Sequence, residues 1–151
     1  MIKMIVEGGG YIYTHLDMIF EGIELDQEYN WLVCDYECPY YANEYLYNRM
    51  NDYVFLTNDE LFNYFVNNDT QFIWGTVIAF DKDIDIADIL SYEIPISHID
   101  MENKNIFFQH PLSEIEIVAQ DSSFFYLMLK NEKYINNFIS KFDNVIILAE
   151  D

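Results

Sequence analysis

The spacing of apolar residues changes its period along this chain, and each period predicts a different element. Residues 2–7 form a short β-branched run before three glycines, which is typical of a strand followed by a turn. From Thr14 onward, apolar residues recur at i, i+3, i+4 and i+7, so a helix of about three turns is expected, with Thr14 as its N-cap. Residues 30–37 predict a second strand and residues 53–56 a shorter third one.

Alternation also assigns the side chains of the second predicted strand to two faces of the sheet. Successive residues of a β-strand point to opposite sides. The two expected sets are Trp31, Val33 and Asp35 on one face and Leu32, Cys34 and Tyr36 on the other.

The rest of the chain continues this mixture of periods. Thr57 and Glu60 fit a capping box, and the helical apolar stripe that follows predicts a helix. Residues 71–80 are nearly continuous in apolar and β-branched side chains, as in a central strand covered on both faces. Residues 81–109 show the least regular pattern, with one helical turn expected at 86–92. The last predicted elements are a hairpin, a helix and a strand, over residues 113–130, 131–142 and 145–148.

Together these elements predict an α+β fold: one globular domain over residues 1–151, with a mixed or mostly antiparallel sheet of about six strands and three or four helices. The chain is 52% hydrophobic and 18% aromatic, which is ample for a core and unlike a disordered acidic tail. The N-terminal apolar run is too short for a signal peptide, and no run reaches the roughly 18 apolar residues of a membrane span. A cytoplasmic location is therefore expected.

Charge narrows the expected partners. The chain has 27 Asp and Glu against seven Lys and Arg, a net charge of −20. Such a surface repels nucleic acid, acidic membranes and phosphate-rich ligands, because binding phosphate needs lysines and arginines. A basic protein is the expected partner, with neither nucleic acid nor membrane, and the oligomeric state is left open. The charge could also serve only to keep an apolar surface soluble.

Two resemblances bear on function. Residues 13–16 and 28–33, with Phe72 to Phe80 and the final hairpin and helix, resemble in layout a small family of uncharacterised Gram-positive bacterial proteins. That family has no assigned chemistry, so this resemblance implies no functional residue. In physical character, a small acidic α+β domain also resembles the immunity proteins that neutralise polymorphic and bacteriocin-type toxins. The second resemblance implies a basic toxin, such as a nuclease, as the partner.

No metal or cofactor is expected from the cysteines and acids. Cys34 and Cys38 have a C-x3-C spacing, but on a strand they would lie about 13 Å apart, too far to share an ion. Residues 81–85 resemble the start of a calcium loop. Ile86 then stands where the loop needs glycine, and Tyr92 where it needs a bidentate glutamate.

The sequence also lacks the usual signatures of catalysis. It contains no nucleophile elbow, zinc-protease motif, phosphate-binding loop or dinucleotide fingerprint. No enzyme is expected and no catalytic residue is assigned. A small hydrolase using His98 or His110 remains an alternative, because irregular segments often carry function.

The predicted binding segment extends from Asp35 to Tyr53, where tyrosines and carboxylates interleave. Tyrosine offers a large contact area with a polar tip, and carboxylates around it steer a basic partner. The alternative is that about half of these rings are core and the acids form a solvated face. The predicted partner-binding residues are Asp35, Tyr36, Glu37, Tyr40, Tyr41, Glu44, Tyr45, Tyr47 and Asp52.

The leading prediction is thus a non-enzymatic acidic binding protein, most concretely an immunity-type inhibitor of a basic toxin. A second possibility is a nucleic-acid mimic that blocks a DNA-binding protein. Mimicry needs the acids gathered on one face. Along the chain they are spread almost evenly, with 14 acids in residues 1–81 and 13 in residues 82–151.

Overall fold

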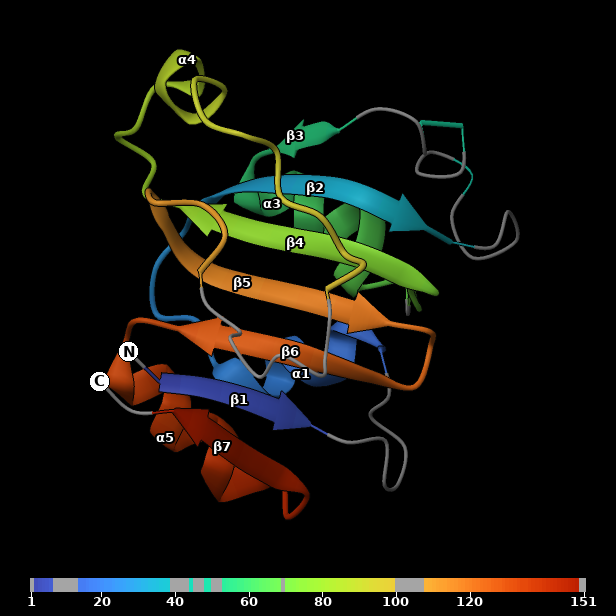
Figure 1. Cartoon of the computed structure of the whole chain (residues 1–151), viewed down its shortest axis with the longest axis vertical. Coiled ribbons are helices and arrows are strands. Elements are labelled where there is room, and N and C mark those ends of the chain that lie inside the picture. The colour runs from blue at the N-terminus through green and yellow to red at the C-terminus, as the bar shows by residue number, and fades with distance from the viewer. Residues whose placement is uncertain are drawn as a thin grey trace.

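The strands form one antiparallel sheet. A computed structural model describes residues 2–6, 14–38, 44, 48–49, 53–68, 70–99 and 108–149, with 2–6 and 148–149 described by their backbone only. Its seven strands are β1 (Ile2–Val6), β2 (Asn30–Glu37), β3 (Val54–Leu56), β4 (Trp74–Phe80), β5 (Ser113–Gln120), β6 (Phe124–Leu129) and β7 (Val145–Ala149). Their order in the sheet is β3-β2-β4-β5-β6-β1-β7, and each neighbouring pair is antiparallel (Figure 1). The predicted α+β fold is confirmed.

The helices are short. They are α1 (Leu16–Ile23), α3 (Asn58–Leu61), which continues as the π-helical turn η1 (Phe62–Val66), α4 (Ile86–Ile89) and α5 (Glu132–Lys141). Within the described ranges, no helix is both long enough and apolar enough to cross a membrane.

One face of the sheet is covered by helices. Figure 1 shows α1, α3 and α5 behind the sheet, and their apolar sides join one large core with alternate residues of the strands. Aromatic rings link the layers: Phe20 of α1 meets Trp31 of β2 edge to face at 5.2 Å, and Phe138 of α5 meets Phe125 of β6 at 6.0 Å. Such pairs add about 0.5–1.5 kcal/mol each beyond the burial of their area.

The helix starts confirm one sequence prediction and correct another. The capping box of α3 is present: Glu60 N donates to Thr57 Oγ1 at 3.2 Å, and Thr57 N donates to the Glu60 carboxylate at 3.1 Å. The prediction that Thr14 caps α1 is wrong, because the Thr14 hydroxyl instead donates to the carbonyl oxygen of Phe72. His15 stands at the N-cap and forms no side-chain cap.

The other face is covered by an irregular segment. We call residues 81–99 and 108–112 the strap; they connect β4 to β5 and cross in front of the sheet in Figure 1. Ile89 of α4 packs with Phe80 and other apolar residues of β2 and β4, while Ile99 and Phe108 pack against β5 and β6. The central strand β4 is therefore buried on both faces, as its continuous apolar run predicts.

Candidate functional site

A bulge near the end of β2 sets the direction of Asp35. The pairing register between β2 and β4 shifts between Cys34 and Glu37, and Asp35 has a φ of 44°. Aspartate tolerates this left-handed backbone better than most residues. A bulge inserts one residue, so the side chains beyond it change faces. Cys34 and Asp35 consequently face the strap, while Tyr36 joins Trp31 and Val33 in the helix-side core. The strict alternation expected for this strand is therefore wrong after Cys34.

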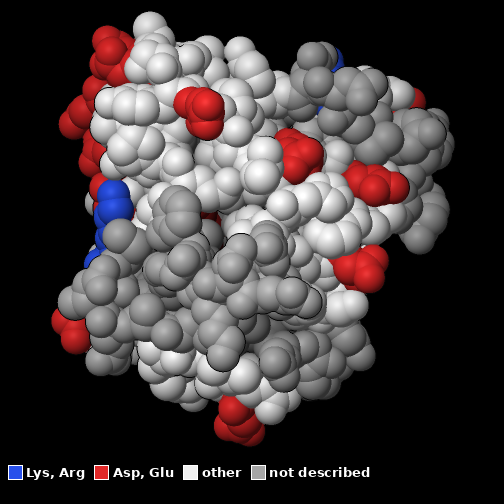
Figure 2. Space-filling model, in the orientation of Figure 1, with Lys and Arg blue, Asp and Glu red and all other residues white. Residues whose placement is uncertain are grey.

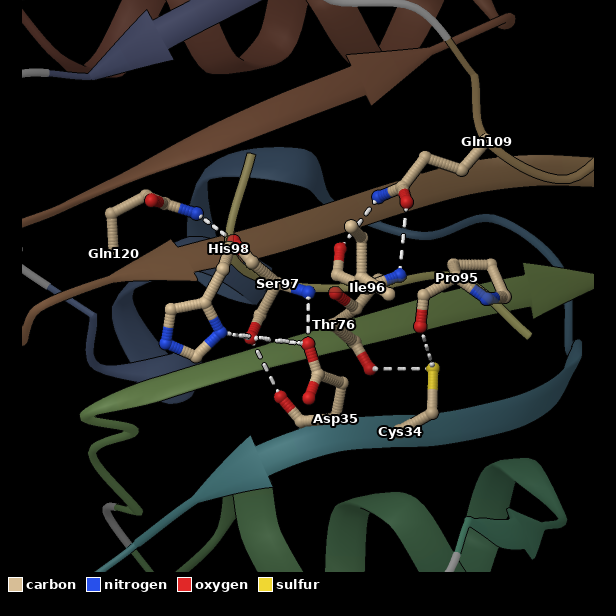
Figure 3. A network of polar contacts seen from close by, with 9 residues as sticks. All are labelled: Cys34, Asp35, Thr76, Pro95, Ile96, Ser97, His98, Gln109 and Gln120. Carbon is tan, nitrogen blue, oxygen red and sulfur yellow. Dashed lines mark hydrogen bonds and ion pairs between the residues drawn. The ribbon is translucent and has the colours of Figure 1, made fainter. Parts of the chain in front are cut away.

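The strap is anchored to Asp35 through Ser97, as Figure 3 shows. The Ser97 amide donates to the Asp35 carboxylate. The Ser97 hydroxyl also donates to Asp35, lying 2.7 Å from its carbonyl oxygen and 2.9 Å from Oδ2. The Gln120 side chain, from β5, donates to the Ser97 carbonyl oxygen. Ser97 is thus held by two strands of the sheet and is fully buried.

Neighbouring contacts extend this anchor along the strap. Ile96 and Gln109 form a reciprocal pair, in which the Ile96 amide donates to Oε1 at 2.9 Å and Nε2 donates to the Ile96 carbonyl at 2.8 Å. The Cys34 thiol donates to the Pro95 carbonyl oxygen at 3.4 Å (Figure 3). The strap around Ser97 is therefore held by the side chain of Gln109, from the far end of the strap, and by side chains of the sheet.

Beside this anchor, the exposed His98 ring stacks on a partly buried tryptophan. Its ring lies on Trp74 of β4 with centroids 4.1 Å apart and planes 22° from parallel. His98 Nδ1 lies 3.7 Å from Asp35 Oδ2, and the side chains are 62% and 40% exposed. We call Asp35, Glu37, Trp74 and His98 the β2-terminal surface; Glu37 is opposite Trp74 in the sheet. The sequence does not indicate that Trp74 reaches the surface, because its strand is nearly continuous in apolar residues; in the structure Trp74 is partly buried.

The cluster of Ser97, His98 and Asp35 does not have the order of a hydrolase triad. In such a triad, one imidazole nitrogen accepts from the serine hydroxyl and the other donates to the carboxylate. Here Nδ1 alone faces both groups, at 3.4 Å from Ser97 Oγ and 3.7 Å from Asp35 Oδ2. Ser97 is also buried and donates to Asp35, so its hydroxyl is not poised to attack a substrate.

Both ring nitrogens of His110 form hydrogen bonds within the fold. It is fully buried; its Nδ1 accepts from the Leu112 amide at 3.2 Å, so Nε2 carries the proton and donates to the Ile89 carbonyl oxygen at 2.8 Å. Both nitrogens therefore tie parts of the strap together. This arrangement gives the hydrolase alternative no free base at His110.

Glu116 of β5 is a buried carboxylate that holds the end of the strap. Its oxygens accept from the amides of Gln109 and His110, each at 2.9 Å, and from the Ser113 hydroxyl at 2.8 Å. Burial raises the pKa of Glu116, and these hydrogen bonds oppose the rise. Its perturbed acidity thus has a structural cause.

The cysteines and the acidic loop do not converge on an ion. Burial raises the pKa of both thiols, for Cys38 to about 11 with a contribution from Glu37, so they stay protonated near neutral pH, whereas metals bind thiolate. At the loop, Asp81 Oδ1 accepts from the Asp83 amide at 2.9 Å, which forms a local turn. Across the described residues, no three His, Cys, Asp or Glu side chains are grouped so that they could hold a metal.

The predicted binding segment is only partly described. Asp35, Glu37 and Glu44 are exposed, and Tyr53, which precedes β3, is 45% exposed. Tyr36 is buried and packs against Phe72 at 6.1 Å, so for this ring the core interpretation holds. The remaining predicted residues, which lie outside the described residues, are Tyr40, Tyr41, Tyr45, Tyr47 and Asp52.

Among the described residues, most exposed acids form no ion pair with a lysine. Three lysines of the described chain pair with acids: Lys82 with Glu28, Lys133 with Asp26 and Lys141 with Glu24, at 2.9, 2.9 and 2.6 Å. On the strap face, Figure 2 shows the acidic side chains in separate positions, with a group beside α4 and uncharged described surface between them. The described acids of this face are therefore spread over it and not gathered in one stripe.

No family model, curated protein or solved structure matches this chain.

Proposed function

We propose that this protein is a non-enzymatic acidic binding protein of the cytoplasm, an immunity-type inhibitor that covers the working surface of a basic toxin such as a nuclease. The observation that carries the proposal is the β2-terminal surface. There, two exposed carboxylates flank the His98 and Trp74 stack, and side chains of the sheet hold the supporting strap in place.

A rigid, negatively charged surface suits rapid capture of a basic protein. Electrostatic steering raises association rates by roughly 10 to 1000-fold, which helps an inhibitor to reach its target before the substrate does. Rings that are already stacked lose little side-chain entropy on binding, and tryptophan is enriched among the residues that contribute most to affinity. Glu37 and Asp35 supply the charge, and the stack supplies contact area.

The two alternatives receive less support from the same surface. An accessible surface of 7783 Å² and a net charge of −20 give about 390 Å² for each net charge. A DNA duplex presents one charge per roughly 100 Å². Mimicry needs the acids gathered on one face, whereas the described acids in Figure 2 lie apart from one another, so this alternative receives less support. The hydrolase alternative lacks a poised nucleophile at His98 and a free base at His110.

The test is the association rate with a basic toxin encoded next to this protein's gene, measured by stopped-flow fluorescence. We expect the rate to fall at least tenfold as ionic strength rises from about 10 mM to about 150 mM, because salt screens exposed charges. At about 10 mM ionic strength, Glu37→Lys should slow association relative to the native protein. Glu132→Lys, the same charge change at an exposed position on α5, should have a smaller effect. A rate independent of salt would contradict the proposal.

Two tyrosines of the segment from Asp35 to Tyr53, one exposed and one buried, allow a contact role to be separated from a core role. Tyr53→Ala removes an exposed ring and should cost about 2 kcal/mol or more of affinity with little change in stability. Tyr36→Ala removes a buried ring and should instead cost about 3–5 kcal/mol of unfolding free energy. Calorimetric binding and denaturant titration separate the two effects. If Tyr53→Ala leaves affinity unchanged, that ring is not part of the interface.

A further inference from the structure

A groove lies between α1 and η1, on the helix side of the molecule. It has a volume of about 430 Å³, within the roughly 300–1000 Å³ typical of ligand pockets. Its apolar lining includes Phe20 and Phe62, whose centroids are 5.2 Å apart, and the partly buried Leu25. η1 is a π-helical turn, in which the Asn67 amide donates to the Phe62 carbonyl oxygen at 2.9 Å. Such turns are rare and frequently occur at functional sites.

One side of the groove is acidic. Asp17 and Glu21 both line it, and their i, i+4 spacing places them side by side on α1. The Glu21 side chain is exposed and makes no ion pair or hydrogen bond within the described ranges. The nearby Lys141 does not neutralise it, since its Nζ is bound to the Glu24 carboxylate at 2.6 Å and to the main-chain oxygen of Glu21 at 2.7 Å.

The groove adjoins the end of the molecule that carries the β2-terminal surface. The Leu16 amide, at the start of α1, donates to the Thr70 carbonyl oxygen at 3.3 Å, and His15 forms a β-bridge with Gln71. Four residues after Thr70, the chain enters β4 at Trp74, opposite Glu37. The start of α1 and the β2-terminal surface therefore belong to the same end of the sheet, on its opposite faces.

We propose that the groove between α1 and η1 binds a basic amphipathic segment of the protein partner, which inserts an apolar side chain beside Phe20 and Phe62 and places a lysine or arginine on Asp17 and Glu21. This inference rests on the proposed function, and charge complementarity selects the occupant. A second copy of the chain would bring a net charge of −20 against the same acidic rim. A basic segment gains both apolar burial and ion pairing there.

The test uses ¹⁵N NMR titration of the whole protein with a helical peptide of about 14 leucines and lysines, long enough to form a marginal helix. We expect the largest amide shifts at Phe20, Glu21 and Phe62. Glu21→Lys should weaken binding by about tenfold or more, since it replaces an attraction with a repulsion. Glu93→Lys, the same charge change at an exposed site on the strap, should leave the peptide affinity nearly unchanged.

The outcomes separate this inference from the function on which it rests. Absence of peptide binding, or shifts spread over the acidic surface with equal losses in Glu21→Lys and Glu93→Lys, would overturn the groove site. Salt-dependent toxin association would then still support the proposed function. Conversely, groove binding without salt-dependent toxin association would count against the immunity-type role alone. A peptide of leucines and glutamates serves as the control for apolar binding and should not bind.

Discussion

The two faces of the sheet are buried in different ways. On the helix face, α1 and α5 form their own backbone hydrogen bonds and offer apolar side chains to the core. On the strap face, little of the covering chain is regular, so its amides and carbonyls need other partners. The sheet supplies several of them through the side chains of Asp35, Glu116 and Gln120.

This difference explains why polar residues occupy central strand positions. Glu116 and Gln120 are buried. Glu116 accepts hydrogen bonds from the strap, and Gln120 donates one to it. Not every polar group under the strap is satisfied: among the described residues, the hydroxyls of Thr76 and Tyr126 are buried without a hydrogen-bond partner. Burial raises the pKa of Tyr126 to about 12. The buried polar groups of this face therefore anchor the strap, but they lower the free energy of unfolding where a hydroxyl has no hydrogen-bond partner.

The largest expected effect is on the helix face. Phe138→Ala removes a fully buried ring that contacts Phe125 and Phe142, so the free energy of unfolding should fall by about 3–5 kcal/mol. Ile139→Ala, at the next position of α5, is the control; this side chain is 39% exposed and its loss should cost less than about 1 kcal/mol. Denaturant titration measures both. Equal losses would mean that α5 does not bury its face as described.

A smaller and more local effect is expected on the strap face. Ser97→Ala removes the hydroxyl that donates to Asp35 and should cost about 1–3 kcal/mol. Hydrogen exchange should accelerate at residues 94–99, while the amides of β4 stay protected. Ser91→Ala is the matched control, because this exposed strap serine donates to the nearby Asp88 carbonyl and, among the described residues, to no strand of the sheet. If Ser91→Ala opens residues 94–99 as much as Ser97→Ala does, Ser97 is not the anchor.

The smallest effect concerns pH. Burial raises the pKa of Glu116 above its ordinary value of 4.5, so the folded state holds this proton more tightly than the unfolded state. Its contribution to stability is fully present below about pH 4.5 and is lost as pH rises through the folded pKa. Glu116→Gln should therefore lose stability less steeply than the native protein as pH rises above this value.

The control for the pH experiment is Glu114→Gln, in the same strand. Glu114 is only partly buried. Replacing it removes the same charge but leaves in place the hydrogen bonds that the strap amides donate to Glu116. The stability of both variants and of the native protein is measured by denaturant titration between about pH 4 and pH 7. Parallel profiles for both variants would show that Glu116 does not titrate differently on folding.

The elements that the sequence predicts well depend on contacts within a few residues. The capping box from Thr57 to Glu60, the β5–β6 hairpin and the apolar side of α5 can each be identified in the sequence, and the structure contains all three. Their signals are local because hydrogen bonds of caps and turns, and the periods of helices, span at most a few positions. The same local character accounts for the predicted burial of β4 on both faces.

The residues that make up the site could be identified only from the tertiary structure. Asp35 and Ser97 are 62 residues apart, and no local pattern links them. The bulge that turns Asp35 toward the strap also moves Tyr36 into the core, which no alternation rule predicts because one inserted residue reverses every face beyond it. By itself the sequence determined the charge, the fold class and most elements. Only the packing of distant segments decided that Trp74 and His98 stack at the surface and that α1 and η1 leave a groove, since both depend on contacts between residues far apart in the chain.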